Sequence, residues 1–132
     1  MNDSELKQLL QNTRTIAVVG LSEKPDRPSH HVAAYLQSVG FRVIPVNPSV
    51  LSILGERSYP TLYDIPEPVD MVDVFRRSDA VPAIAQEAIA IGAKSLWLQE
   101  GVIHEEAAAM AKAAGLQVVM DRCILKEHER VG

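Results

Sequence analysis

Short apolar runs recur along this chain, and most of them end at glycine, proline or a polar residue. Compact runs rich in β-branched side chains are typical of strands that are buried on both faces of a sheet. The runs predict strands at Ile16–Val19, Phe41–Val46, Met71–Phe75, Ser95–Leu98 and Leu116–Met120. A shorter strand is expected over Ser58–Leu62, at the edge of the sheet.

Helical periodicity fills most of the intervals between these strands. A short helix near the N-terminus has Leu6, Leu9 and Leu10 on one face, with Asp3 or Ser4 as its N-cap. Further helices are predicted over Ser29–Ser38, Ser78–Ile91 and His104–Ala114, with Ser29 and Ser78 as N-caps. Residues 121–132 are expected to form a polar tail.

Three times, a predicted helix ends at a glycine and a strand follows at once, in SVGFRVIPVN, AIGAKSLWLQ and AAGLQVVMD. This repeat is typical of parallel βαβ units with right-handed crossovers. The pattern therefore predicts an α/β fold in one domain over residues 1–132, with a doubly wound parallel sheet. The expected strand order is 3-2-1-4-5-6, with Ser58–Leu62 at the edge.

Ligands of such sheets bind outside the carboxyl ends of the strands. The segments expected there are Gly20-Leu21-Ser22, Asn47-Pro48, Phe75-Arg76-Arg77-Ser78, Gln99-Glu100-Gly101 and Asp121-Arg122-Cys123. The first of these opens a long polar loop that leads to Ser29 and contains Lys24 and Arg27. Anions bind readily at the N-terminus of a helix, so this loop is the first candidate site.

Composition narrows the function classes. The chain has 132 residues, of which 47% are hydrophobic and 23% charged, as in globular proteins. A net charge of -4 argues against a nucleic-acid or anionic-membrane partner. The single cysteine, Cys123, and the lack of a membrane-length apolar run or leader pattern predict a cytoplasmic protein. Whether it forms a homo-oligomer is left open by the sequence.

Phosphate-binding motifs are incomplete. Only Gly20 matches the dinucleotide fingerprint, Asn47 replaces the acidic residue expected after the second strand, and no Walker A pattern is present. Two basic clusters remain at the carboxyl edge, Lys24 with Arg27 and Arg76 with Arg77. These clusters favour a small-molecule ligand that carries more than one phosphate group.

Catalytic patterns are sparse. His30 and His31 begin a helix without further metal ligands at suitable spacing, and His104 begins another beside two glutamates. Trp97 lies inside a predicted strand and is expected in the core. Cys123 is expected at the carboxyl edge, either as a small buried residue or as a thiol near the ligand. No catalytic or metal site is predicted.

Several stretches resemble one family in the same order along the chain: IAVVGLSEKPDRPSHHVAAYL, VIPVNP, VDVFRRSD, LWLQEGV and DRCILKEH. Together they resemble the stand-alone CoA-binding proteins, which are similar to the N-terminal CoA-binding domain of the succinyl-CoA synthetase α subunit. The resemblance implies a Rossmann-like fold and coenzyme A or an acyl-CoA as ligand. It extends over nearly the whole chain.

The resemblance also implies a set of cofactor-binding residues. Gly20, Leu21 and Ser22, with Ser29 at the helix start, would hold the phosphates, and Lys24 and Arg27 would neutralise their charge. Asn47 and Pro48 would line the nucleotide side, Phe75 and Arg76 would flank the ligand, and Gln99 and Glu100 would close the far wall.

The sequence departs from the synthetase subunit in two ways. Its first loop contains less glycine, and Ser49-Val50 stands where that subunit has a lysine after the second strand. A chain of 132 residues also lacks room for the domain with the phosphorylated histidine, so ligase activity is not predicted. Two alternatives stay open: an NAD(P)-binding oxidoreductase or redox sensor, and a non-enzymatic protein interaction module.

Overall fold

One five-stranded parallel sheet forms the centre of the protein, in a computed structural model that describes residues 1–132. Its order is β2-β1-β5-β6-β7, and every pair of neighbours is parallel. The strands are β1 (Thr15–Val19), β2 (Arg42–Val46), β5 (Met71–Val74), β6 (Ser95–Leu98) and β7 (Gln117–Val119). The order reverses direction between β1 and β5, as in a doubly wound Rossmann-like fold, which confirms the predicted fold class.

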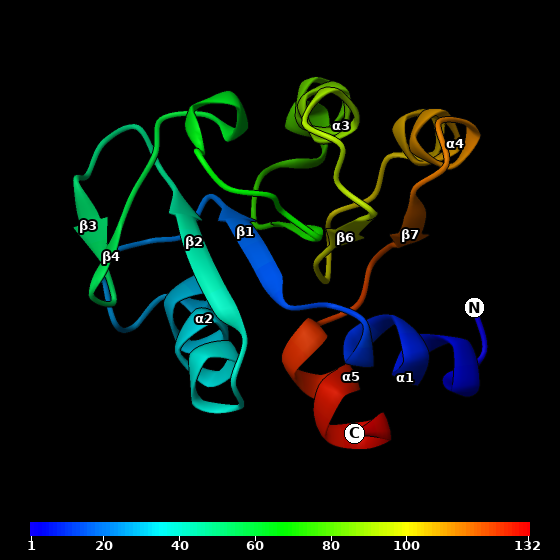
Figure 1. Cartoon of the computed structure of the whole chain (residues 1–132), viewed down its shortest axis with the longest axis horizontal. Coiled ribbons are helices and arrows are strands. Elements are labelled where there is room, and N and C mark those ends of the chain that lie inside the picture. The colour runs from blue at the N-terminus through cyan, green and yellow to red at the C-terminus, as the bar shows by residue number, and fades with distance from the viewer.

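Helices cover both faces of this sheet (Figure 1). One face carries α3 (Val81–Ala90) and α4 (Glu105–Ala113). The other carries α1 (Asp3–Gln11), α2 (Pro28–Ser38) and α5 (Ile124–Val131). No helix is both long enough and apolar enough to cross a membrane.

Successive side chains of each strand point to opposite faces of the sheet and so belong to two separate hydrophobic cores. Ala17, Val72 and Leu96 belong to the core under α3 and α4, whereas Ile16 and Trp97 belong to the core under α1, α2 and α5. All residues of β1, β5 and β6 are buried. Burial on both faces explains why these strands appear in the sequence as continuous apolar runs. The prediction that Trp97 is a core residue is confirmed.

The predicted edge strand over Ser58–Leu62 is wrong. Only Tyr59 pairs there, through a single parallel bridge to Val46. Its N–H donates to the Pro45 carbonyl, and its own carbonyl accepts from Asn47. Pro60 follows, and a Thr61–Asp64 capping box then begins the short 3-10 helix η1 (Leu62–Asp64). A small hairpin of β3 (Ser52–Ile53) and β4 (Glu56–Arg57) precedes this segment.

Three predicted helix starts are also wrong. The N-cap of α1 is Asn2, in a capping box with Glu5, rather than Asp3 or Ser4. Helix α2 begins at Pro28 after Arg27, because a proline suits the first helical position. Before α3 the chain forms the 3-10 turn η2 (Ser78–Ala80), so Ser78 does not cap that helix.

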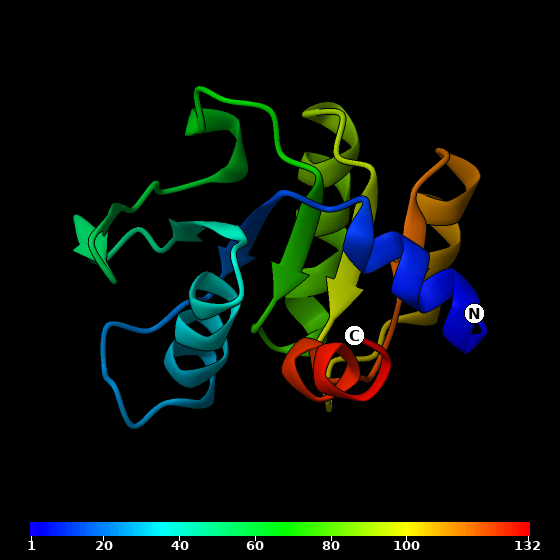
Figure 2. The same cartoon turned by 60° about the horizontal axis from the view of Figure 1, so that its bottom comes forward.

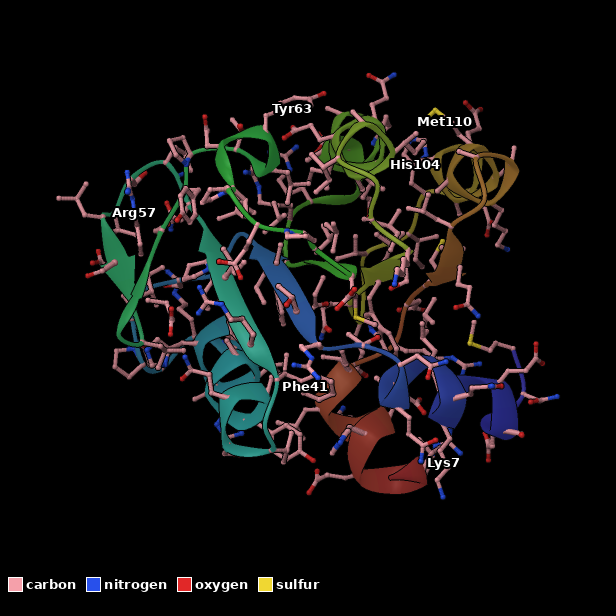
Figure 3. All side chains as sticks on the ribbon, viewed as in Figure 1. Lys7, Phe41, Arg57, Tyr63, His104 and Met110 are labelled. Carbon is pink, nitrogen blue, oxygen red and sulfur yellow. The ribbon has the colours of Figure 1, made fainter.

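The predicted polar tail is a helix, α5, packed against α1 and α2. Ile124 is fully buried, and the Tyr35 hydroxyl is hydrogen-bonded to Nδ1 of His128 at 2.6 Å. Figure 3 shows Phe41 at the start of β2, beside α5. Its ring packs edge to face against the His128 ring, with the two ring centroids 5.6 Å apart. Arg130 forms an ion pair with Asp3 of α1 at 2.8 Å. These contacts fix α5 over the sheet.

Candidate ligand-binding groove

The loop from β1 to α2 lies at the carboxyl edge of the sheet, as does the start of α5 (Figure 2). Gly20 begins this loop with φ +86°. A Cβ atom at this position would overlap the carbonyl oxygen of Phe75 and would lie 2.9 Å from Cδ of Arg76. Glycine is therefore required here by the end of β5, which approaches the turn from the neighbouring strand.

Two serines shape the loop. The Ser22 N–H donates to Oγ of Ser29 at 3.0 Å, and the Lys24 N–H donates to Oγ of Ser22 at 3.1 Å. Ser29 is buried in the first turn of α2, so its hydroxyl ties the loop to the helix instead of capping it. A cavity of about 250 Å³ lies here, lined by Gly20, Ser22, Arg27, Pro28, Ser29 and Phe75.

A larger cavity of about 520 Å³ lies beside the first one, and Pro28 and Phe75 line both. We call the two together the groove, with a polar end at the β1–α2 loop and an apolar end beyond Phe75. The apolar end is further lined by Val32, Arg76, Arg77, Gln99, Glu100, Val102 and Cys123. The groove thus joins a loop suited to phosphate with an apolar channel.

Positive charge beside the groove is largely unpaired. Lys24, Arg27 and Arg76 form no ion pair and no side-chain hydrogen bond. By contrast, Arg77 pairs with Asp79 at 3.0 Å, and Glu100 pairs with Lys126 at 2.8 Å. The Glu100 carboxylate raises the pKa of Lys126, chiefly through their hydrogen bond. The three unpaired cations are therefore free to bind an anion.

Some expected ligand residues have other partners in the structure. The Leu21 side chain is fully buried. The Asn47 side chain donates to the Leu21 carbonyl at 2.9 Å and accepts from the Ser49 N–H at 2.8 Å. Pro48 lies outside the groove, in a cavity of about 110 Å³ that Arg76 also lines. Asn47 thus joins two loops of the carboxyl edge, and both of its polar groups are already satisfied.

Gln99 and Cys123 both line the apolar end of the groove, and Gln99 is hydrogen-bonded to the first residue of α5. Gln99 is buried, and its Oε1 accepts from the N–H of Ile124 at 3.2 Å. Cys123 is half-buried, immediately before α5. Although β7 is an edge strand, the chain turns back toward β6 after it. The Trp97 indole of β6 donates to the Arg122 carbonyl at 2.8 Å. This return brings the Cys123 thiol to the groove.

Sequence reasoning missed Val32 and Val102 as groove residues, and it missed the buried Asp73 beneath the groove. Val32 was predicted only as a core position of its helix, and Val102 lies in a loop without periodicity.

Asp73, within β5, is fully buried, and neither of its carboxylate oxygens has a hydrogen-bond partner. Burial raises its pKa well above the ordinary value for aspartate. In the sequence, the only indication of this buried carboxyl group is that Asp73 is the one polar residue in the apolar run Met71–Phe75.

Other titratable groups form no catalytic constellation. No group of three or more histidine, cysteine, aspartate or glutamate side chains is placed to hold a metal ion. His104, labelled in Figure 3, caps α4 by accepting the Ala107 N–H at 3.1 Å on Nδ1. The groove has the unpaired Arg27 at its polar end, and the unpaired Arg76 together with an apolar wall at its other end.

Comparisons with known proteins agree with this geometry. The sequence model of a family described as "CoA binding domain" matches residues 14–129. The chain is 44% identical to the uncharacterized protein YneT of Bacillus subtilis, over 95% of this chain and 93% of that protein. A hypothetical protein from Pyrococcus horikoshii has a structure with a TM-score of 0.97 at 37% identity, covering 99% of this chain and 92% of that one. An ADP-forming acetate–CoA ligase of Archaeoglobus fulgidus is 30% identical over 70% of this chain but only 14% of its own length.

Proposed function

The chain belongs to the CoA-binding domain family, and from this premise we propose that it binds coenzyme A or an acyl-CoA in the groove. The observation that carries the proposal is the adjacency of the two cavities, which places the β1–α2 loop with Arg27 beside a more apolar space. Coenzyme A has the same two parts, since its phosphates are followed by a long pantetheine arm.

The polar end suits the phosphates. The cavity lies at the N-terminus of α2, where backbone N–H groups and the helix dipole favour an anion. Arg27 lines this cavity and Arg76 lines the neighbouring one, both without an anionic partner. A phosphate bound by either guanidinium would gain charge-assisted hydrogen bonds, which are about twice as strong as neutral ones.

The apolar end suits the pantetheine arm. Val32, Phe75 and Val102 give it an apolar wall, and Cys123 stands among the lining residues. An arm that leaves the phosphates at the α2 N-terminus would pass Phe75 and then meet this wall. Its thiol, or an acyl group on it, would lie toward the Cys123 side of the groove.

Two observations favour coenzyme A over a nicotinamide dinucleotide. The residue after β2 is Asn47 rather than an acid, and its amide is already bound to the Leu21 carbonyl and the Ser49 N–H. The usual partner for a ribose hydroxyl is therefore missing. We assign no reaction to the site, where Cys123 is the one thiol among the lining residues.

Titration calorimetry and thermal unfolding with coenzyme A and NAD test the proposal. A ligand that binds only the folded state raises its stability, by about 2.7 kcal/mol when its concentration is a hundred times the Kd. We expect this rise with coenzyme A and none with NAD. If only NAD raises the stability, the proposal is replaced by the NAD(P)-binding oxidoreductase or redox sensor. If neither ligand raises it, the non-enzymatic protein interaction module is the remaining alternative.

A charge-matched pair of variants tests whether binding occurs in the groove. Arg27→Ala removes a cation that lines the polar end, and Lys112→Ala removes an exposed cation on α4, on the opposite face of the sheet. Loss of a charge-assisted contact costs about 1.5–3 kcal/mol, so Arg27→Ala should weaken coenzyme A binding by roughly 10- to 100-fold. Lys112→Ala should leave it unchanged. Equal effects of the two variants would show that binding depends on overall charge and not on the groove.

A further inference from the structure

The carboxyl group of Asp73 is the one buried side-chain group without any hydrogen-bond partner. It lies in β5, between β1 and β6, and none of its surface is exposed. Unsatisfied polar groups in native interiors are rare, and each calls for an explanation. An apolar residue of similar size would fit the core without this desolvation cost.

The strand register places Asp73 directly beneath the groove. Side chains alternate along a strand, so Asp73 and Phe75 are on the same face of β5. Its register partner on β6 is Trp97, whose core lies under α1, α2 and α5, and the next residue on that face of β6 is Gln99. Phe75 and Gln99 both line the groove. Asp73 is therefore two residues, or about 7 Å, below the groove floor along both strands.

No side chain around Asp73 accounts for its burial, and the nearby Val74 N–H, which acts to lower its pKa, makes no hydrogen bond of ordinary geometry with it. Asp73 has no ion-pair partner, and no metal-ligand cluster includes it. Desolvation favours its neutral form, in which it offers one O–H donor and a carbonyl acceptor. A neutral carboxyl group can therefore pair with an amide, which also offers one donor and one acceptor.

We propose that Asp73 is a specificity-determining residue that hydrogen-bonds an amide of the ligand's pantetheine arm when the arm enters between Phe75 and Gln99. Phe75 is only half-buried, and it is the groove-lining side chain of β5 that would have to move to admit the arm. The inference rests on the proposed binding of coenzyme A. It adds that the apolar end of the groove selects a ligand with an amide-bearing arm, and not merely an apolar one.

Two variants at one position separate this role from a structural one. Asp73→Leu removes both hydrogen-bonding groups and the desolvation cost, whereas Asp73→Asn keeps a donor and an acceptor. Calorimetry would compare coenzyme A with adenosine 3′,5′-bisphosphate, which lacks the arm. We expect Asp73→Leu to raise the apo Tm, to weaken coenzyme A binding about tenfold, as for one lost buried hydrogen bond, and to leave the bisphosphate unaffected. Asp73→Asn should stay within about threefold of the wild type.

An infrared measurement on the unaltered protein gives a second test, independent of whether the leucine variant folds. The measurement is made at an acidic pH at which the wild type shows a carboxylic-acid carbonyl stretch that is absent in Asp73→Asn. This band should move to lower frequency when coenzyme A binds. The bisphosphate should not move it. If coenzyme A binds the wild type but neither shifts this band nor loses affinity in Asp73→Leu, the role of Asp73 is overturned while the proposed function stands. If the wild type does not bind coenzyme A, both fail.

Discussion

Replacing Gly20 by alanine is expected to destabilise the protein more than the same change at another glycine of matched backbone geometry. Gly20 has φ +86° and Gly92, which follows α3, has φ +78°. Both substitutions force a side chain into the left-handed region. Only at Gly20 does the added Cβ meet other atoms, since at Gly92 nothing lies within 4 Å.

The expected loss of unfolding free energy is the sum of a backbone cost, shared by both positions, and a steric cost at Gly20 alone. The left-handed conformation costs an alanine about 1–2 kcal/mol at either position. At Gly20 the Cβ also overlaps the Phe75 carbonyl oxygen and lies 2.9 Å from Cδ of Arg76, and overpacking of this kind costs about 1–3 kcal/mol more. We therefore expect a loss of roughly 2–5 kcal/mol for Gly20→Ala and about 1–2 kcal/mol for Gly92→Ala.

Urea unfolding of both variants, followed by circular dichroism, measures the two losses directly. The difference between them isolates the contact with the end of β5, because the backbone term is shared. In Gly20→Ala, a displacement of the Phe75 backbone by the added Cβ should also weaken ligand binding, because Phe75 lines the groove. Equal losses for the two variants would refute the reasoning, since the carbonyl of Phe75 would then have moved aside at no cost.

Three further predictions concern single groups. Because burial raises the Asp73 pKa in the folded state, the unfolded state loses this proton first as pH rises above about 3.9. The free energy of unfolding contributed by this residue should therefore fall with increasing pH, and urea titrations from pH 4 to 7 should show a growing stability advantage of Asp73→Leu over the wild type. Tyr35→Phe removes the hydrogen bond to His128 and should cost about 1 kcal/mol in the same assay, with no change if the hydroxyl is equally satisfied by water. Incubation with coenzyme A disulfide should form a mixed disulfide at Cys123 by thiolate exchange, releasing one coenzyme A thiol, and intact-mass analysis should show an adduct that is absent in Cys123→Ser. If no adduct forms and a small alkylating reagent also fails to react, Cys123 behaves as a core residue.

The central strands were predictable from the sequence because burial on both faces leaves a continuous apolar run. Ile16–Val19 is of this kind, and Met71–Val74 departs from it only at Asp73. The Ser58–Leu62 segment has no such run, and strand formation there depends on partners that the sequence does not reveal. Pairing stops after Tyr59 because Pro60 lacks an N–H and the Thr61–Asp64 capping box turns the chain.

The loop residues were predictable by position but not by role. Ser29 has the residue type of an N-cap, yet its hydroxyl accepts the Ser22 N–H, and Arg27 occupies the N-cap position of α2. Asn47 was expected at the carboxyl edge and lies there, but its amide is used within the protein. Such choices among local hydrogen-bond partners depend on distances between segments that are remote in sequence.

Helix α5 was missed for a different reason. Its apolar residues Ile124, Leu125 and Val131 are separated by charged ones, and the packing stripe is completed by His128, which a hydropathy pattern counts as polar. Only the contact of this ring with Tyr35 and Phe41 shows that it belongs to the buried side. The spacing of these positions at 124, 125, 128 and 131 is nevertheless helical, and it was available in the sequence.

The docking of α5 has a consequence for the order in which the protein can assemble. The whole sheet precedes α5 in the chain, and it can pair its strands before α5 arrives. Cys123 and the buried Gln99–Ile124 contact, however, close the groove only once this helix is in place. A ligand that spans the groove would therefore hold the first loop and α5 together, about a hundred residues apart in the chain. Local opening of α5 would then become rarer in its presence, and amide hydrogen exchange in this helix would report occupancy of a site that lies mostly on other elements.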